Sequence, residues 1–423
     1  MIFLANTLTM NGGTTFLLRL CKALSLRGER CAVLLLRDHG DSQMIAELSA
    51  HAAILRLPDF VPLPRLPQHF GIFGRVRWNA LLDALRPYGR HVHAMGVFSL
   101  LFARRLADRA SSLRVTAGVY HQNEFMYDPG GLPFPAQAQR LFASLPADNV
   151  VFFNEVVRDH YADFFARDYG RAMVVPIGIE LAPAPARESA PVEHLIVSIG
   201  NLVDFKTYNR HVIEMLPALV RTVGQLRYDI YGDGPEEPAL RSLAERLGVA
   251  PQVRFLGRLP YARFGEVVSP ATVFVGSGTA LIEAAALGVP ALIGIESNPN
   301  QTSYGLISHV PGLTYNEDTP SLPKRPMLPL LTDLLTDPAV WLRESSACAE
   351  KANDFSVART AAGFAALENL AREWEGGSGK AGMTRTWTGL VATIAFETVT
   401  RQKSFSGRRN QSFNGHSSGG SGR

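Results

Sequence analysis

The sequence predicts an α/β protein built from two Rossmann-like domains that face a central cleft. Short, unbroken apolar runs alternate with helical patterns along most of the chain, which is typical of parallel strands covered on both faces. This alternation stops once, at a stretch rich in proline and alanine (182–191), and then restarts. The length of 423 residues also exceeds what one hydrophobic core usually holds, so we expect two domains.

The first half supplies six apolar runs and three helical patterns. The expected strands cover residues 2–6, 31–36, 92–95, 115–120, 150–153 and 173–176, and the expected helices 14–27, 98–110 and 155–165. The first of these helices carries Phe16, Leu20 and Leu24 on one side and has Gly28 at its C′ position. Proline and glycine crowd residues 57–75, which predicts a long surface loop of a kind that often has a function.

The alternation of apolar runs and helical patterns resumes after the linker. We expect strands at 194–199, 227–231, 253–256, 271–275 and 291–295, and helices at 210–223, 236–247 and 357–373. The domain boundaries follow: a first domain at 1–181, the linker at 182–191, a second domain at 192–355, a closing helix at 356–375 and a tail at 376–423.

The tail differs from the rest in composition. Glycine and serine fill both of its ends, and residues 401–409 are basic, so we expect 376–423 to be disordered. A short apolar run at 390–396 leaves an alternative, in which this part of the tail touches a membrane.

Composition and missing motifs exclude several classes of protein. The net charge of +4 is small for this length, which argues against nucleic acid as a partner but permits contact with an anionic membrane face. Three scattered cysteines and the lack of a signal peptide or membrane span predict a cytoplasmic protein. No HExxH, P-loop, CxxC or GxSxG pattern is present, so metal-dependent hydrolysis, kinase-type transfer and α/β-hydrolase chemistry are disfavoured.

The stretch 276–290 is the strongest candidate for a functional site. An apolar strand ends in the turn Gly276-Ser277-Gly278-Thr279, and an alanine-rich helix follows until Gly288 stops it. A turn of this kind presents backbone N–H groups to an anion. Glu283 lies about one helical turn further on.

Each residue of this stretch also has a plain structural interpretation. Ser277 or Thr279 could serve only as an N-cap, and Glu283 could be a solvent-facing glutamate that favours the start of a helix. The apolar and small neighbours of Glu283 make an exposed face a poor fit.

Four further residues follow strands of the expected sheets. Gly12 and Gly13 come after the first strand, where glycine permits positive φ and close approach of a ligand, although such a turn is as often structural. Lys206 lies beyond the first strand of the second domain, where it could neutralise a phosphate or be a solvated surface lysine. His121 follows the strand at 115–120 and should emerge at a carboxyl end, whereas His93 lies inside a strand and is expected to be a core histidine.

The order of these motifs resembles the GT-B nucleotide-sugar glycosyltransferases, closest to glycosyltransferase family 4 (group 1). The resemblance rests on the glycine pair, Gly-x5-Lys ending at Lys206, the run Gly-Asp-Gly-Pro at 232–235, Val-x-Phe-x-Gly at 253–257 and Glu-Ala-x-Ala-x-Gly-x-Pro at 283–290. It covers about residues 1–374 and leaves the tail without a counterpart. It implies an acceptor domain first and a donor-nucleotide domain second.

The resemblance also implies roles for single residues. Lys206 would contact the donor diphosphate, Glu283 the ribose hydroxyls, and Gly12 and Gly13 the diphosphate and sugar. His121 would be the catalytic histidine near the reacting centre.

The resemblance and the positions after strand ends together imply a set of donor-binding residues: Gly12, Gly13, Asn201, Lys206, Ser277, Gly278, Thr279 and Glu283. Two positions depart from the family pattern. Asn201 stands where the family has an arginine, and Val275 where it usually has a second glutamate that contacts the donor sugar. We therefore expect Ser277, Thr279 or the loop 296–301 to hold the sugar, and the stereochemical outcome stays open with retention favoured.

The expected function is transfer of a sugar from a nucleoside-diphosphate donor to a glycan or lipid-linked acceptor, as in polysaccharide or glycoconjugate synthesis. No cofactor or metal is expected, since Lys206 and the turn would stabilise the departing diphosphate. The protein would be cytoplasmic, with peripheral contact at the inner membrane face as an option. The alternatives are a non-catalytic sugar-nucleotide-binding scaffold and a GT-B sugar-nucleotide epimerase, which Gly276 and Ala284 disfavour.

Overall fold

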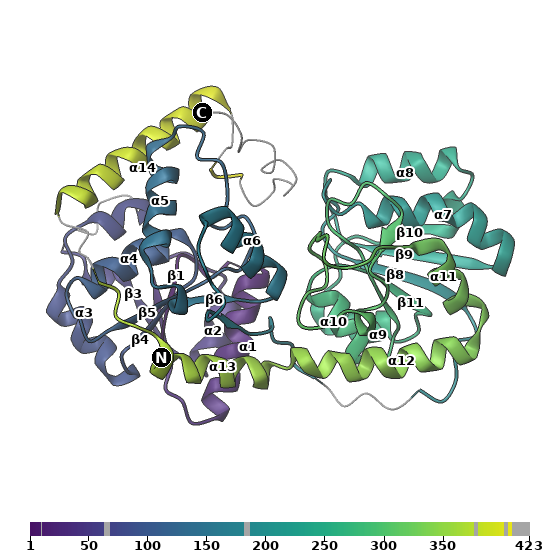
Figure 1. The fold of residues 1–423 in the computed structure, drawn as a ribbon, viewed down its shortest axis with the longest axis horizontal. Coiled ribbons are helices and arrows are strands. Elements are labelled where there is room, and N and C mark those ends of the chain that lie inside the picture. The colour runs from purple at the N-terminus through teal and green to yellow at the C-terminus, as the bar shows by residue number, and fades with distance from the viewer. Residues whose placement is uncertain (10, 63–67, 182–186, 376–379, 402–404, 408–423) are drawn as a thin grey trace. The chain divides into compact units, whose positions relative to one another are not determined.

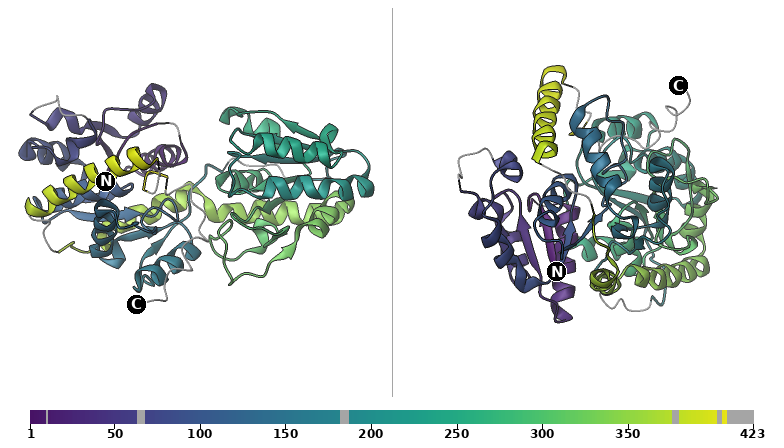
Figure 2. Two further views of the ribbon diagram at one scale, coloured as in Figure 1. Left: turned by 90° about the horizontal axis from the view of Figure 1, so that it is seen from above. Right: turned by 60° about the vertical axis from the view of Figure 1, so that its left-hand side comes forward.

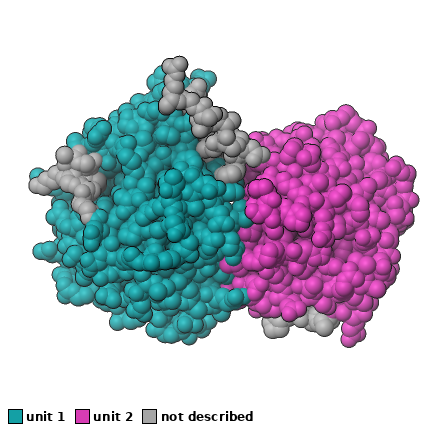
Figure 3. Space-filling model, in the orientation of Figure 1, with its two compact units in different colours: residues 1–178, 357–423 teal, residues 179–356 magenta. Residues whose placement is uncertain are grey.

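The computed structural model describes the chain except for residues 10, 63–67, 182–186, 376–379, 402–404 and 408–423. The chain forms two compact units (Figure 1, Figure 3). The first contains residues 1–178 and 357–423, and the second contains residues 179–356. Parts of the expected loop at 57–75, the linker and the tail thus fall outside the described residues.

A parallel sheet forms the centre of the first unit, with the strand order β3-β2-β1-β4-β5-β6-β7. Its strands are β1 (Ile2–Ala5), β2 (Ala32–Leu35), β3 (Ala53–Arg56), β4 (His91–Ala94), β5 (Arg114–Gly118), β6 (Val150–Phe152) and β7 (Met173–Val174). The six strands expected from apolar runs are present, and β3 is an additional one.

Both faces of this sheet are buried, as the unbroken apolar runs predict. Along β1, Ile2 and Leu4 join the core on one face, while Phe3 and Ala5 join the core on the other. This alternation is the two-residue period of a strand. The helices that cover the two faces are α1 (Gly12–Leu26), α2 (Ser42–Ser49), α3 (Trp78–Leu85), α4 (Val97–Ala107), α5 (Pro133–Ser144), α6 (Glu155–Phe165) and α13 (Val357–Leu370).

The helix expected to close the second domain belongs to the first unit instead. In α13, Ala361, Phe364 and Leu367 are buried against the face of the sheet that α1 also covers. The Phe364 ring centroid lies 6.2 Å from that of Phe3 and 4.9 Å from that of His93. The apolar side of α13 thus completes a core that residues 1–178 leave open, which is why the boundary falls at 356 and 357.

The tail contains a helix that its composition did not predict. Helix α14 (Lys380–Thr400) packs along α5 (Figures 1 and 2). Leu390 and Phe405 are buried in the core of the first unit, and the Phe405 ring lies 5.1 Å from the ring of Phe134. Glycine- and serine-rich ends therefore enclose an ordered segment whose apolar run has a place to pack.

The second unit has its own parallel sheet, with the strand order β10-β9-β8-β11-β12. Its strands are β8 (His194–Ile199), β9 (Leu226–Tyr231), β10 (Val253–Phe255), β11 (Val273–Gly276) and β12 (Ala291–Ile293), beside a small antiparallel pair, β13 (Thr302–Ser303) and β14 (Arg325–Pro326). Its helices are α7 (Tyr208–Val223), α8 (Glu237–Arg246), α9 (Phe264–Val268), α10 (Thr279–Ala286), α11 (Met327–Thr336) and α12 (Pro338–Ala352).

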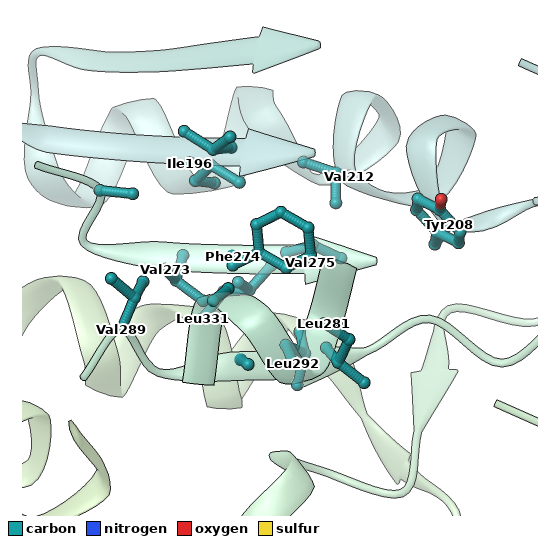
Figure 4. Packing of buried hydrophobic residues seen from close by; sticks show 14 of the residues in the cluster. Ile196, Tyr208, Val212, Val273, Phe274, Val275, Leu281, Val289, Leu292 and Leu331 are labelled. Atoms are coloured by element: carbon teal, nitrogen blue, oxygen red, sulfur yellow. The ribbon is translucent and has the colours of Figure 1, made fainter. Parts of the chain in front are cut away.

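The core of this unit lies on both sides of β11 (Figure 4). Phe274 and Val275 are fully buried in it, where α7, α10 and α11 all pack against β11. This packing fixes the carboxyl end of β11, from which the turn 276–279 departs.

Candidate functional site

The strand order of the second unit places a switch point between β8 and β11. From β8 the chain proceeds outward through β9 and β10, and from β11 it proceeds the other way to β12. In open α/β sheets, ligands bind at the carboxyl ends of strands where the order reverses. Three loops meet there: the lysine loop (200–207) after β8, the turn 276–279 after β11, and the acid loop (296–301) after β12.

Two glycines hold the lysine loop in place. A Cβ atom on Gly232 would lie 1.9 Å from the Gly200 carbonyl oxygen, and one on Gly234 would lie 2.1 Å from the Leu202 carbonyl oxygen. The Leu202 N–H also donates a hydrogen bond to the Asp233 carbonyl oxygen at 2.9 Å. The Gly-Asp-Gly-Pro run after β9 therefore needs its glycines because two backbones approach each other closely.

The acid loop fixes the lysine loop from the other side. The Ser297 N–H donates to the Phe205 carbonyl oxygen at 2.7 Å, and the Thr207 hydroxyl donates to the Asn298 carbonyl oxygen at 2.7 Å. These two bonds flank Lys206 on either side. The lysine side chain therefore starts from a backbone that its neighbours hold rigidly.

Glu296 is the carboxylate of this cluster, and its sequence context singled it out only as part of a loop. Its Oε1 accepts a hydrogen bond of 3.1 Å from the Ser277 hydroxyl. Burial raises the pKa of Glu296 above its ordinary value, although the Lys206 ammonium and hydrogen bonds from Ser277 and Asn316 lower it. A carboxyl that keeps a raised pKa beside a lysine is poorly solvated, as expected of a group that faces a ligand.

The N-terminus of α10 has no side-chain cap. Its N-cap is Gly278, whose φ of 71° favours glycine, and no side chain accepts a hydrogen bond there. The interpretation of Ser277 or Thr279 as a simple N-cap is therefore wrong, since the Ser277 hydroxyl donates to Glu296 instead. The N–H groups of the first turn of α10 and the positive end of its dipole point out of the turn 276–279.

Glu283 and Val275 both lie inward. Glu283 is only 9% exposed, so the interpretation as a solvent-facing glutamate does not hold. Val275 is fully buried in the core around β11. The position where the family pattern has a second glutamate is thus a core position in this chain, and the carboxylate beside Ser277 is that of Glu296.

A buried tyrosine that no sequence motif indicated lies under the lysine loop. The Tyr208 hydroxyl is buried and has no hydrogen-bond partner among the described residues. It would lie 3.4 Å from a Cβ atom on Gly200, and its ring would lie 2.4 Å from one on Gly294. An unpaired buried hydroxyl costs about 1–3 kcal/mol, so Tyr208 is a candidate for contact with a ligand. Its sequence signal is its place two residues after Lys206, at the first position of α7.

The lysine loop contains one other candidate site residue, Asn201. Asn201 is solvent-exposed and brings no charge to the site. Lys206, which is half-buried, therefore supplies the positive charge of the lysine loop at this end of β8. The alternative of a fully solvated lysine does not fit its loop bonds or its electrostatic contact with Glu296.

In the first unit, Gly12 and Gly13 begin α1 and do not form a turn before it. Asn11 is the N-cap, and its Oδ1 accepts from the N–H groups of Gly13 at 2.9 Å and Thr14 at 3.2 Å. Neither glycine has a positive φ, so that part of the expectation is wrong. A Cβ atom on Gly12 would meet nothing within 4 Å, which leaves open space at this helix N-terminus.

His121 emerges just beyond the carboxyl end of β5, as expected. Its Nδ1 accepts from the Asn123 N–H at 3.2 Å, so the neutral ring carries its proton on Nε2. The residue before it, Tyr120, is tied to the sheet through a 2.7 Å hydrogen bond between its hydroxyl and His93 Nε2.

That bond is one end of a buried polar chain across β4 and β5. Thr116 Oγ1 bonds His93 Nδ1 at 2.8 Å and His91 Nε2 at 2.7 Å. Burial lowers the pKa of His91 to about 3 and that of His93 well below its ordinary value, so both rings are neutral. The expectation that His93 is a satisfied core histidine is confirmed.

Other chemical features are sparse in the described part of the chain. No group of three or more His, Cys, Asp or Glu residues is placed there to hold a metal ion. All three cysteines are buried free thiols. Among the described helices, none is both long and apolar enough to cross a membrane.

Comparisons with known proteins find a family match within the second unit. Residues 186–301 match the family model "Glycosyl transferases group 1". The chain also resembles a phosphatidylinositol N-acetylglucosaminyltransferase component of Arabidopsis thaliana, with 27% identity over 128 residues. That alignment covers 28% of this chain and 28% of the relative, so the chain matches only a small part of the relative's length.

Solved structures share the fold over most of the chain. An Anabaena protein, HepE, crystallised with UDP and glucose, superposes with a TM-score of 0.59 at 14% identity, covering 87% of this chain and 98% of that one. A glycosyltransferase from Rickettsia africae gives a TM-score of 0.61 at 13% identity, covering 87% and 97%. The lipopolysaccharide outer core galactosyltransferase WaaB gives 0.56 at 15% identity, covering 86% and 98%.

These findings define the class of the protein. The chain has the GT-B fold of the nucleotide-sugar glycosyltransferases. Its residues 186–301, which contain the lysine loop, the turn 276–279 and Glu283, match the group 1 glycosyltransferase family.

Proposed function

We propose that the protein transfers a sugar from a nucleoside-diphosphate donor to a glycan or lipid-linked acceptor, with retention at the anomeric carbon. The observation that carries the proposal is the convergence of Lys206, Ser277 and Glu296 on the uncapped N-terminus of α10. A diphosphate fits a lysine and the N–H groups of a helix start, because both present positive charge. The complex of HepE with UDP and glucose supports a donor of this class.

The donor would be held by three kinds of contact. Lys206 and the N–H groups of the turn 276–279 bind the phosphates, and the buried Glu283 accepts hydrogen bonds from the ribose hydroxyls. Glu296 and Ser277 hold the sugar, in place of the carboxylate that Val275 does not supply. The Tyr208 hydroxyl gains a partner when the site fills.

The same positive groups would assist the chemistry. As the glycosidic bond breaks, negative charge develops on the departing diphosphate, and Lys206 and the α10 N-terminus stabilise it there. We therefore propose transfer without a divalent metal. In the first unit, His121 and the start of α1 at Gly12 and Gly13 would serve the reacting sugar and the acceptor. The protein would act in the cytoplasm, in peripheral contact with the inner membrane face when its acceptor is lipid-linked.

Donor binding and turnover should be measured together. Isothermal titration with UDP, GDP and ADP is followed by hydrolysis and transfer assays with the corresponding sugars, each with and without EDTA. The proposal expects one nucleotide to bind, and its sugar conjugate to turn over in EDTA with the anomer retained by proton NMR.

Two single variants locate the site. Glu283→Ala and Lys206→Ala should each weaken nucleotide binding, whereas Glu245→Ala, an exposed carboxylate of α8, should not. Nucleotide binding without any turnover would favour a scaffold protein, and binding unchanged in both variants would refute the site.

A further inference from the structure

Helix α14 exposes an apolar side that is unusual for the surface of a protein. Trp387, Val391 and Ile394 follow the i, i+4, i+7 spacing of one helix face and are 41%, 39% and 45% exposed. Phe396 and Val399 add further exposed apolar area near the end of the helix. From 384 to 400 the exposed side of α14 carries a single charged side chain, Arg385.

The opposite side of α14 is firmly attached to the first unit. A Cβ atom on Gly389 would lie 3.2 Å from the Phe134 backbone nitrogen and 3.3 Å from Pro133 Cβ, so the two helices approach closely at the start of α5. Leu390 and Thr393 are buried on this side. The side of α14 that packs against this core is therefore a different one from the side that carries Trp387, Val391 and Ile394.

Charge gives the tail a second distinctive property. Residues 376–423 contain seven lysine and arginine residues but one acidic residue, Glu397. The whole chain has 42 basic and 38 acidic residues, so the part before the tail has a net charge of −2 and the positive charge of the protein lies in the tail.

Glu397 is occupied within the fold. Its Oε1 accepts hydrogen bonds from the Phe405 N–H at 2.6 Å and the Ser406 N–H at 3.0 Å. These bonds secure the return of the chain after α14, where Phe405 enters the core. The acidic residue of the tail thus has a structural role beside an otherwise basic segment.

We propose that the exposed side of α14 docks on an anionic lipid surface. Trp387 is a residue type that favours the boundary between headgroups and acyl chains, and the net positive charge of the tail sequence complements the charge of the lipid. The helix would lie on the surface, since no described helix can cross it. This inference rests on the proposed function, because it names the surface at which the enzyme would meet a lipid-linked acceptor. Its test does not require sugar transfer.

Vesicle sedimentation tests the docking directly. The full chain is mixed with vesicles of phosphatidylcholine alone, or with about 30% phosphatidylglycerol, at low and at high salt. The proposal expects binding to the anionic vesicles that weakens with salt, because exposed charges are screened. The triple variant Trp387→Ser, Val391→Ser, Ile394→Ser should lose at least about tenfold in vesicle affinity, because several exposed apolar side chains are removed together.

A matched control separates this surface from general stickiness. Leu26, Phe164 and Leu370 are also exposed apolar residues of the first unit, at 82%, 41% and 57%, and their triple serine variant should bind vesicles as the native chain does. Brominated lipid should quench tryptophan fluorescence in the native chain and much less in Trp387→Phe. Thermal unfolding and nucleotide binding are measured in every variant, so a failed site in the second unit and a failed docking surface give different results.

Three outcomes would overturn the inference. One is native protein that ignores anionic vesicles, and another is equal loss of binding in the control triple variant. The third is a native dimer that the α14 variant converts to a monomer without any vesicle binding, which would make a second copy of the chain the occupant.

Discussion

The Ser277 hydroxyl donates a hydrogen bond of 3.1 Å to the Glu296 carboxylate, and this bond joins the carboxyl ends of β11 and β12. It also explains why Ser277 does not cap α10. A serine before a helix usually satisfies an N–H group of the first turn. Here the carboxylate takes the hydroxyl, and the helix start stays available to an anion.

The raised pKa of Glu296 predicts that Glu296→Gln increases the stability of the protein and lowers its sugar-transfer activity. A carboxyl whose pKa rises on folding costs stability at every pH above its unfolded pKa, and the amide removes that cost. Urea unfolding at about pH 7.5 should therefore give a higher midpoint for the variant, whereas sugar transfer should fall by at least about tenfold, for the loss of one charged hydrogen bond. Glu245→Gln should change neither, and an E296Q enzyme with full activity would remove Glu296 from the site.

Lys206 is expected to act mainly through binding of the diphosphate. A charge-assisted hydrogen bond contributes about 1.5–3 kcal/mol, so Lys206→Met should weaken nucleoside-diphosphate binding about 10- to 150-fold. Binding of the nucleoside alone should change little, because it lacks the phosphates. Titration calorimetry with both ligands checks this, and equal losses for the two would mean that the variant has disturbed the loop.

Gly12 allows stability and function to be separated in the first unit. Gly12→Ala places a methyl group where nothing lies within 4 Å, in the first turn of a helix where alanine is preferred. The free energy of unfolding should stay the same or rise by up to about 1 kcal/mol. If the donor or acceptor approaches this backbone, kcat/KM should nevertheless fall, and unchanged kinetics would exclude such an approach.

Buried neutral histidines should make the first unit sensitive to acid. The pKa of His91 is about 3 when folded and 6.5 ordinarily, so its contribution is fully present above pH 6.5 and is lost as the pH falls toward 3. Each pH unit in that window costs about 1.4 kcal/mol. His91→Gln should flatten the decline of the urea midpoint between about pH 6.5 and about pH 4.5, whereas His39→Gln, at an exposed position, should not.

The sequence predicts elements best where the apolar periodicity of a helix and its terminating residues, such as glycine, agree. The helix expected at 155–165 is α6, and Gly288 ends α10 with a φ of 70° as expected of a C′ glycine. Strand β3 and helices α2, α3, α5, α9, α11 and α12 escaped prediction because their patterns are short or uneven. Helix α13 was assigned to the wrong domain because an apolar face does not reveal which core it covers.

The site was predictable only in part for a similar reason. Lys206, Ser277 and Glu283 follow or open regular elements, so their position could be inferred from strand ends. Glu296 and Tyr208 join them through loop bonds and glycine contacts between segments far apart in the sequence. No local pattern encodes such contacts.

The return of the chain through α13 has a practical consequence for dissecting the protein. The Ile179 N–H donates to the Phe355 carbonyl oxygen at 2.9 Å, so the two ends of the second unit meet. The second unit is therefore an insertion that could be excised at 179 and 356 and produced by itself. A fragment that stops at residue 178 would instead leave Phe3 and Phe16 without Phe364, and is expected to aggregate unless 357–374 is supplied in trans or by a short fusion.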